Sequence, residues 1–310
     1  MSRKPILLTG SHRSGSTWVG RMIAGNPSVV YIREPFNVSH PPGIGISSAR
    51  FDHWYTYISD ENADCFYRKI ERTLNFSYGL GAELREEKRS KNLYKISREF
   101  LAFNKYKILG KRPLLKDPLA LLSAEWLASK FDMDVVVLIR HPAAFASSLK
   151  QKGWEFSFSN FLDQDELMRD HLYPFEAALK SYANGDYDII DQASLLWKVL
   201  HHMIQKYQET HGDWLFVRHE DVSEQPLLVF QDIFNYLNLE FTEKNSQVIK
   251  EYSSVSNPVE GTSDVTHTLR RNSKDNIKSW KNKLTTTEIE RIRTQVEAVS
   301  CNFYADEDWQ

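Results

Sequence analysis

Residues 5–18 read PILLTGSHRSGSTW, a short apolar run followed by two glycines five positions apart. A glycine, four residues and a second glycine between a strand and a helix is the spacing of a phosphate-binding loop, in which backbone N–H groups surround an anion. A nucleoside-triphosphate loop has lysine after the second glycine, but here that position is Ser16 and the positive charge lies inside the loop on Arg13. The loop therefore predicts an anion site without the residue that reaches a γ-phosphate, and hence a nucleotide with a different leaving group.

Short β-type runs alternate with longer helical segments along the chain. The clearest strand is VVVLI at residues 135–139, an uninterrupted apolar run typical of a strand buried on both faces. The alternation predicts one α/β domain over residues 1–310, P-loop-like, with a central, mainly parallel sheet of about five strands flanked by helices. Strands are expected at 6–9, 29–32, 114–116, 135–139 and 215–217, and helices at 16–26, 119–130, 142–150, 192–210 and 226–237.

Two aromatic-rich segments, 40–110 and 151–190, do not fit this alternation. Ligands of open α/β sheets bind beyond the carboxyl ends of the strands, so insertions that leave those ends would form the walls of a pocket. We therefore expect both segments to lie on the substrate side of the site. The alternative, that their aromatic side chains only pack helices onto the sheet, stays open for each residue.

The charge and composition of the chain exclude several classes of protein. Lys and Arg number 39 against 41 Asp and Glu, a balance unlike the basic excess of a nucleic-acid binder. Two cysteines, Cys65 and Cys301, are too few for a disulfide framework or a zinc site. No apolar run reaches the roughly 18 residues of a membrane span, and the N-terminal run is too short for a signal peptide. We expect a cytoplasmic protein without a metal.

A second anion site is predicted at the end of the 135–139 strand. Arg140 follows this strand directly, Pro142 opens the next helix, and Ser148 lies eight residues after the arginine. An arginine at the carboxyl edge of a sheet, with a hydroxyl about two helical turns further on, offers donors to an anion. A nucleoside triphosphatase would instead often place an aspartate here to hold magnesium. The alternative is a solvated arginine at the end of a strand.

The densest basic stretch lies at residues 270–283 and reads RRNSKDNIKSWKNK. Basic runs are usually solvated faces, and this remains the alternative. In a slightly acidic chain, however, such a stretch indicates a third candidate group of anion ligands, headed by Arg270 and Arg271.

Together these segments resemble the sulfotransferases that use 3′-phosphoadenosine 5′-phosphosulfate (PAPS). RSGSTW at residues 13–18 is similar to the family's 5′-phosphosulfate loop, and Arg140 with Ser148 resembles its 3′-phosphate site, including the eight-residue spacing. WKN at 280–282 resembles a C-terminal Trp-Lys element, and RHED at 218–221 resembles another family segment. The resemblance covers most of the chain and implies PAPS as co-substrate.

The resemblance also implies roles for the residues of the loop. Arg13 would contact the oxygen that bridges phosphate and sulfate and would stabilise the charge of the leaving group. Trp18 would pack near adenine; the alternative for this side chain is the core beneath the first helix. The residues implied to hold the 5′-phosphate are Ser14, Gly15, Ser16 and Thr17.

For the 3′-phosphate, the resemblance implies Arg140 and Ser148 as ligands, with Arg270 and Arg271 closing over the group. Here the chain departs from the family's pattern. The arginine pair lies two or three residues further from the Trp-Lys element than in the familiar cytosolic enzymes, and Asn272 stands where glycine is usual. Which of the two arginines acts is left open.

The general base has two main candidates, and His12, His40 and His141 are further possibilities, although histidines at such places are more often loop or capping residues. Cytosolic members of the family use a histidine in a Lys-Thr-His segment after the third strand, where this chain has KDP at residues 116–118. Carbohydrate-directed members use a glutamate soon after the second strand, and Glu34 holds that place here. We expect Glu34 to be the base and Lys116 to assist the transferred group, with Asp117 as the second candidate. The alternatives are an ion pair of Glu34 with Arg33 and a helix-capping role for Asp117.

These observations predict transfer of a sulfuryl group from PAPS to a hydroxyl of a small-molecule, lipid or carbohydrate acceptor. The partners expected are therefore a small molecule or a glycan, with no nucleic acid, no membrane span and no metal. Two other functions stay open, a kinase-like phosphotransferase of the P-loop class and a non-catalytic nucleotide-binding protein. The sequence leaves the acceptor and the oligomeric state open.

Overall fold

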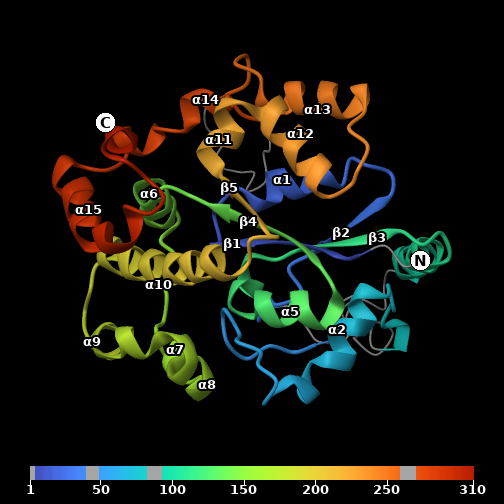
Figure 1. The fold of residues 1–310 in the computed structure, drawn as a ribbon, viewed down its shortest axis with the longest axis horizontal. Helices are drawn as coiled ribbons and strands as arrows, with labels where there is room; N and C mark the ends of the chain where they lie inside the picture. The colour runs from blue at the N-terminus through green and yellow to red at the C-terminus, as the bar shows by residue number, and fades with distance from the viewer. Residues whose placement is uncertain (1–3, 40–48, 82–92, 259–269) are drawn as a thin grey trace.

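A parallel sheet of five strands in the order β2-β3-β1-β4-β5 forms the centre of the molecule (Figure 1). Its coordinates come from a computed structural model that describes residues 4–39, 49–81, 93–258 and 270–310. All four neighbouring pairs of strands are parallel, which confirms the predicted α/β architecture and the five strands. The strands are β1 (Ile6–Gly10), β2 (Val29–Arg33), β3 (Arg112–Lys116), β4 (Asp134–Ile139) and β5 (Leu215–Arg218).

Helices cover both faces of the sheet, with α1, α12 and α13 on one side and α2, α5 and α10 on the other (Figure 1). The longer helices are α1 (Ser16–Ile23), α2 (Tyr67–Leu74), α4 (Leu93–Ile108), α5 (Ala124–Phe131), α6 (Pro142–Lys152), α9 (Glu176–Asn184), α10 (Ile189–Thr210), α12 (Pro226–Tyr236), α13 (Glu243–Ser253) and α15 (Thr286–Ser300). Short turns of helix are η1 (Ala63–Cys65), η3 (Pro118–Ser123), α7 (Ser159–Leu162), α8 (Asp165–Leu167), η4 (Met168–Leu172), η5 (Tyr173–Phe175), α11 (His219–Glu224), α14 (Ser273–Asn276), η6 (Ser279–Asn282) and η7 (Asp306–Trp309).

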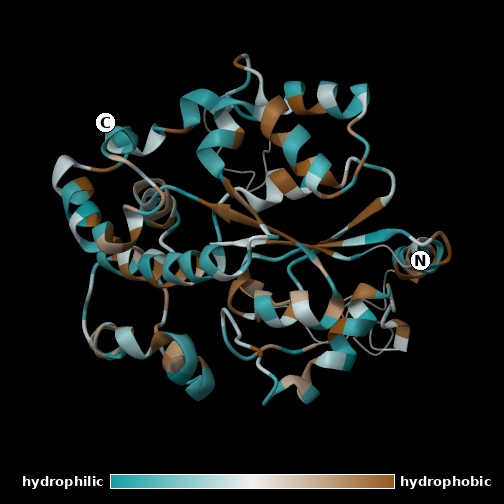
Figure 2. Ribbon diagram, in the orientation of Figure 1, coloured by the Kyte–Doolittle hydropathy of each residue, from teal (hydrophilic) through white to brown (hydrophobic). Residues whose placement is uncertain are grey.

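The central strands divide the core into two layers. On β1, Leu7 packs into one hydrophobic cluster while Ile6 and Leu8 pack into the other, as the alternation of side chains along a strand requires. The five residues of β1 and all but the first residue of β4 are buried. Figure 2 shows the strands as largely hydrophobic, with hydrophilic residues spread over the outer helices. The uninterrupted apolar run at 135–139 therefore corresponds to a strand, β4, that is buried on both faces of the sheet.

The predicted helix at 119–130 is wrong as a single element. The chain instead forms the 3₁₀-helix η3 over Pro118–Ser123 and then the α-helix α5 over Ala124–Phe131. All six residues of η3 are buried, and its sequence, PLALLS, has almost no polar face to turn to solvent. Packing on every side, rather than the periodicity of one apolar face, therefore decides whether this segment forms a 3₁₀-helix or an α-helix. The other predicted helices and strands are confirmed within three residues at each end.

The carboxyl ends of the five strands meet at one edge of the sheet because all of the strands run in the same direction. Gly10, Arg33 and Lys116 are the last residues of β1, β2 and β3, and Arg140 directly follows β4. Polar and charged residues from distant parts of the sequence are thereby brought to one place. This edge is where ligands bind in open α/β sheets.

Candidate functional site

The loop between β1 and α1 has the backbone of an anion-binding nest. Gly10, Arg13 and Gly15 all have positive φ, at 133°, 64° and 89°. At Gly10 the reason is a close approach, since a Cβ would lie 2.2 Å from the carbonyl oxygen of Leu138. Alternation between right- and left-handed conformations turns successive N–H groups to one side, where they can surround an anion. The two glycines thus allow the tight loop backbone that their spacing in the sequence predicts.

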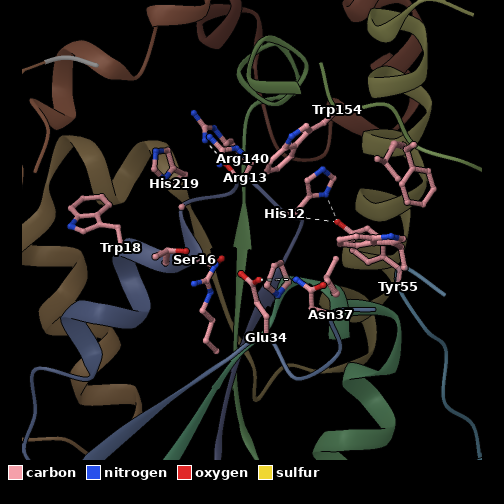
Figure 3. A pocket seen from close by; sticks show the side chains of 18 of the residues that line it. His12, Arg13, Ser16, Trp18, Glu34, Asn37, Tyr55, Arg140, Trp154 and His219 are labelled. Carbon is pink, nitrogen blue, oxygen red and sulfur yellow. Dashed lines mark hydrogen bonds between the residues drawn. The ribbon is translucent and has the colours of Figure 1, made fainter. Parts of the chain in front are cut away.

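A cavity of about 910 Å³ opens in front of this loop (Figure 3). Four arginines and two glutamates line it, so its formal charge is positive although that of the whole chain is negative. Segments from both predicted insertions contribute to its wall, with Trp54 and Tyr55 from the first and Trp154 and Phe156 from the second. Residues 40–48 and 82–92 of the first insertion lie outside the described residues.

Arg13 is held by contacts on three sides. Its Nε donates a hydrogen bond to Ser148 Oγ at 2.9 Å, its guanidinium lies 5.4 Å from the centre of the Trp154 ring, and Arg140 donates to its backbone carbonyl. Burial and the nearby charge of Arg271 lower the pKa of Arg13. Cations that crowd together in this way would be relieved by a bound anion.

Arg140 lies beside Arg13 at the same side of the cavity, together with His219 (Figure 3). Burial, together with the charges of Arg13 and Arg271, lowers the pKa of Arg140 to about 10, although Glu220 opposes the shift. Its backbone carbonyl accepts a hydrogen bond from Trp197 Nε1 at 2.8 Å, which fixes the turn after β4. Three arginines thus converge on a single region, as a second anionic group of a ligand would require.

Two residues of the cavity wall hold a buried nitrogen that pairs with no other described residue. These nitrogens are Trp18 Nε1 and Arg140 Nε, whereas the His219 ring contacts the backbone of Ser14 and the hydroxyl of Ser223. Buried polar atoms are normally hydrogen-bonded, so unpaired ones in a cavity indicate groups reserved for a ligand. Trp18 also packs edge-on against Phe230 and His219, with ring centres 5.6 and 6.2 Å away. It therefore belongs to the core beneath α1 and to the cavity wall at once.

Glu34 and Lys116 form an ion pair at the carboxyl ends of β2 and β3. Lys116 is fully buried, and its Nζ donates to Glu34 Oε1, while Asn37 Nδ2 donates to the other carboxylate oxygen at 3.4 Å. Burial alone would raise the pKa of Glu34, but Lys116, Arg33 and Asn37 outweigh it, and the pKa is lowered. The cavity thus holds an ionised carboxylate directly beside a buried ammonium. Arg33 is not the ion-pair partner of this glutamate.

Five predicted residues do not line the cavity, namely Ser14, Lys116, Asp117, Ser148 and Arg270. Asp117 is fully buried, and its carboxylate accepts from Phe36 N at 2.6 Å and Leu119 N at 3.0 Å. It caps the N-terminus of η3, which is the helix-capping role named above as the alternative to a base, and both of its carboxylate oxygens accept hydrogen bonds from the backbone. Asp117 therefore has a structural role in this structure, and its candidacy as the base stays a prediction that the pH profile below tests. Ser14 is also fully buried, and its hydroxyl has no partner among the described residues.

The two C-terminal arginines point in different directions. Arg271 lines the cavity, whereas Arg270 forms an ion pair with Glu251 on α13 and lies 5.4 Å from the ring centre of Tyr252. The expectation that both close over one phosphate is therefore not met in this structure, because Glu251 and Tyr252 hold the Arg270 guanidinium against α13. Trp280 of the predicted Trp-Lys element is buried and stacks on His141, away from the cavity.

His12 and Tyr55 line the cavity, although the sequence predicts no role for Tyr55 and gives His12 only as a further possibility for the base. The Tyr55 hydroxyl is within hydrogen-bonding distance of both His12 N, at 3.0 Å, and His12 Nδ1, at 2.5 Å. The sequence places His12 inside the loop, but no spacing rule links it to a tyrosine 43 positions away. His219 is similar, since only the resemblance of residues 218–221 draws attention to it.

Two further properties concern metals and membranes. Within the four described ranges, no three or more His, Cys, Asp or Glu side chains gather where they could hold a metal ion. None of the helices in these ranges is both long enough and apolar enough to cross a bilayer.

Comparison with known proteins gives one family. The model of the sulfotransferase family matches residues 5–243, which is most of the chain, while no curated protein sequence matches. Among solved structures, the sulfotransferase domain of the curacin biosynthetic pathway is 14% identical, covering 96% of this chain and 99% of that one, with a TM-score of 0.49. The sulfotransferase domain of a Synechococcus olefin synthase is 16% identical, with coverages of 98% and 96% and a TM-score of 0.48. A mouse sulfotransferase complexed with PAP is 13% identical, with coverages of 98% and 87% and a TM-score of 0.46.

Proposed function

This chain belongs to the sulfotransferase family, and we propose that it transfers a sulfuryl group from PAPS to a hydroxyl of a small-molecule, lipid or carbohydrate acceptor. Family membership supports sulfuryl transfer in general; the nucleotide and the type of acceptor are the proposal. The observation that carries it is the meeting of two anion-binding features in one cavity, the backbone of the loop before α1 and the cluster of Arg13, Arg140 and Arg271 beside it. Such a pair of sites suits a nucleotide with phosphates at two separate positions.

The two features would divide the nucleotide between them. The N–H groups of the loop and the hydroxyls of Ser16 and Thr17 would hold the 5′-phosphate at the N-terminus of α1, where the helix dipole favours an anion. Arg140 and Arg271 would hold the 3′-phosphate, a group that ATP lacks. The unpaired nitrogens of Trp18 and Arg140 fit a ligand that supplies acceptors. Ser148 would support the site through Arg13, to which it is hydrogen-bonded.

The chemistry requires a base for the acceptor and stabilisation of the leaving group. Glu34 would take the proton from the acceptor hydroxyl, whose oxygen forms a bond to sulfur as the bond from sulfur to the bridging oxygen breaks. The electron pair of that bond leaves on the 5′-phosphate of 3′,5′-adenosine bisphosphate (PAP), where Arg13 would stabilise it. Lys116 is fully buried and does not line the cavity, so its assistance to the transferred group would act through the Glu34 carboxylate that it holds.

The test of this function is calorimetry with PAP and with ATP plus Mg²⁺, followed by an acceptor screen with labelled PAPS. We expect PAP to bind more tightly and label to move to at least one alcohol, phenol, lipid or sugar. Tighter binding of ATP with Mg²⁺ would favour a kinase-like phosphotransferase. Tight binding of PAP without transfer to any acceptor would favour a non-catalytic nucleotide-binding protein.

The pH dependence of kcat/KM should show which carboxyl group is the base. A base must be ionised, and the pKa of Glu34 lies below the ordinary value of 4.5, so activity should persist as the pH falls from neutrality and decline only below that value. Burial raises the pKa of Asp117 to about 7, so a rate that already declines near neutral pH would instead point to Asp117. The measurement is a pH profile with the acceptor that the screen identifies.

Replacing Gly15 with alanine should damage the loop. The new Cβ would lie 2.4 Å from His219 Nδ1 at a φ of 89°, which side chains rarely adopt. We expect PAP affinity to fall about 10-fold or more and the free energy of unfolding to fall by about 1–3 kcal/mol, measured by calorimetry and thermal denaturation. Gly212→Ala, which meets nothing within 4 Å, is the matched control. If the clash is the cause, adding His219→Ala should restore part of the stability; no recovery would assign the loss to the backbone alone.

A further inference from the structure

His12 lies in the anion loop next to Arg13 and lines the cavity, although neither phosphate binding nor the base requires a histidine there. Its ring is held in place on two sides. The Phe145 ring packs edge-on against the imidazole, with the two ring centres 5.1 Å apart. The Tyr55 hydroxyl contacts Nδ1 of the imidazole (Figure 3). An imidazole fixed this firmly presents one of its nitrogens to the cavity in a defined direction.

Counting protons decides which nitrogen carries the hydrogen. The Tyr55 hydroxyl accepts from His12 N–H at 3.0 Å, and the side chain of Tyr55 is almost fully buried. Its own proton has only one acceptor among the described residues, His12 Nδ1 at 2.5 Å. If Nδ1 instead carried a hydrogen, the tyrosine proton would be buried without an acceptor, which is costly. Tyr55 therefore favours the tautomer of His12 with Nδ1 bare and the hydrogen on Nε2.

The Nε2–H group has no partner among the described residues. The ring lies close enough to Arg13 and Glu34 for the charge of each to influence it. Burial, with a smaller effect of Arg13, lowers the pKa of His12 to about 3, so the ring is neutral at physiological pH. The loop thus presents an uncharged N–H donor between the arginine and the carboxylate that the reaction would use.

We propose that His12 is a catalytic hydrogen-bond donor, whose Nε2–H contacts an oxygen of the transferred sulfonate, and that Tyr55 is the positioning residue that sets its tautomer. This inference rests on the proposed function. His12 cannot serve as the base in this state, because the nitrogen that faces the cavity already holds a proton. A neutral donor polarises the sulfonate while leaving Glu34 as the acceptor of the proton. It also adds no charge to a region where three arginines already repel one another.

The tautomer can be observed in the wild-type protein without any ligand. Protein labelled with ¹⁵N-histidine should show, near neutral pH, one imidazole in which Nδ1 is unprotonated and Nε2 carries the hydrogen, assigned by its loss in His12→Phe. Tyr55→Phe should convert this signal to a mixture of tautomers. A wild-type spectrum with the hydrogen on Nδ1 would overturn the proposal. Because the position of the hydrogen is read in the wild-type spectrum, variants serve only to assign the signal, and His12→Gln provides the assignment if His12→Phe folds poorly.

The contact to sulfonate is tested by comparing PAPS with PAP, which lacks that group. His12→Phe keeps the shape of the ring and removes the donor, so affinity for PAPS should fall about 10- to 100-fold while affinity for PAP stays nearly unchanged. His12→Gln retains an N–H and should therefore recover part of the lost PAPS affinity. Tyr55→Phe should lower PAPS affinity less than His12→Phe does, and should likewise leave PAP affinity nearly unchanged. Equal losses for the two nucleotides would assign His12 a structural role in the loop and overturn the proposal.

The two levels of inference fail in different ways. If the wild-type protein binds neither PAPS nor PAP, the proposed function is wrong whatever the tautomer of His12. If it binds both and transfers sulfate, but His12→Phe has no selective effect on PAPS, the function stands and the role of His12 is wrong.

Discussion

Replacing Glu34 with glutamine is expected to lower sulfuryl transfer by about 10²- to 10⁴-fold, the usual contribution of a general base. The amide is similar in size to the carboxylate but cannot take a proton from the acceptor. Affinity for PAP should remain close to that of the wild type, because the nucleotide would be held by the loop and the arginines. The measurement is turnover with labelled PAPS, together with calorimetry of PAP binding.

Glu155→Gln is the matched control, because Glu155 is the other carboxylate that lines the cavity and no described residue is hydrogen-bonded to its side chain. We expect this variant to lose at most a few-fold in turnover. Glu34→Gln also removes the counter-ion of the buried Lys116, so a lower melting temperature is expected. Turnover equal to that of the wild type in a folded Glu34→Gln variant would assign the base to another group.

Replacing Arg140 with alanine should weaken PAP binding by about 10²- to 10³-fold, as expected when one partner of a buried charge pair is truncated. Adenosine 5′-monophosphate has no 3′-phosphate, so its affinity should change far less. The comparison of the two ligands by calorimetry is therefore an internal control. Arg140→Lys keeps the charge but not the planar fork of donors, and should give an intermediate loss of PAP affinity.

A second role of Arg140 makes the comparison necessary. Its guanidinium also donates to the backbone carbonyl of Arg13, so its loss could disturb the loop itself. A disturbed loop would weaken both nucleotides alike, since both carry a 5′-phosphate. Equal losses would therefore assign Arg140 to support of the loop and remove it from the 3′-phosphate site.

Local patterns in the sequence were sufficient for the architecture. The continuous apolar run of β4 and the alternation of strands with helices predict a parallel sheet, because backbone pairing and burial depend mainly on periodicity. The failure at residues 119–130 has the opposite cause. There the residues are apolar on every side, so periodicity carries no information and packing chooses between a 3₁₀- and an α-helix.

The candidate site was predictable where its residues follow one another in the chain. The loop at 10–18 and the pair of Arg140 and Ser148 have a readable spacing, because each belongs to one strand, one turn and one helix. The spacing does not reveal that the Ser148 hydroxyl accepts from Arg13, 135 positions earlier, and its role at the 3′-phosphate stays a prediction. The choice of Arg271 over Arg270, and the use of Asp117 as a cap, likewise depend on neighbours that only folding supplies.

The sequence by itself thus determined the sheet, the anion loop and the cationic character of the site, since these follow from local geometry and charge. Tertiary structure alone decided which groups face one another. It paired Lys116 with Glu34 across two parallel strands, and it brought Tyr55 from an insertion against His12 in the loop. The physical reason is that protonation and hydrogen bonding depend on burial and on neighbours a few ångströms away, which separation along the chain does not specify.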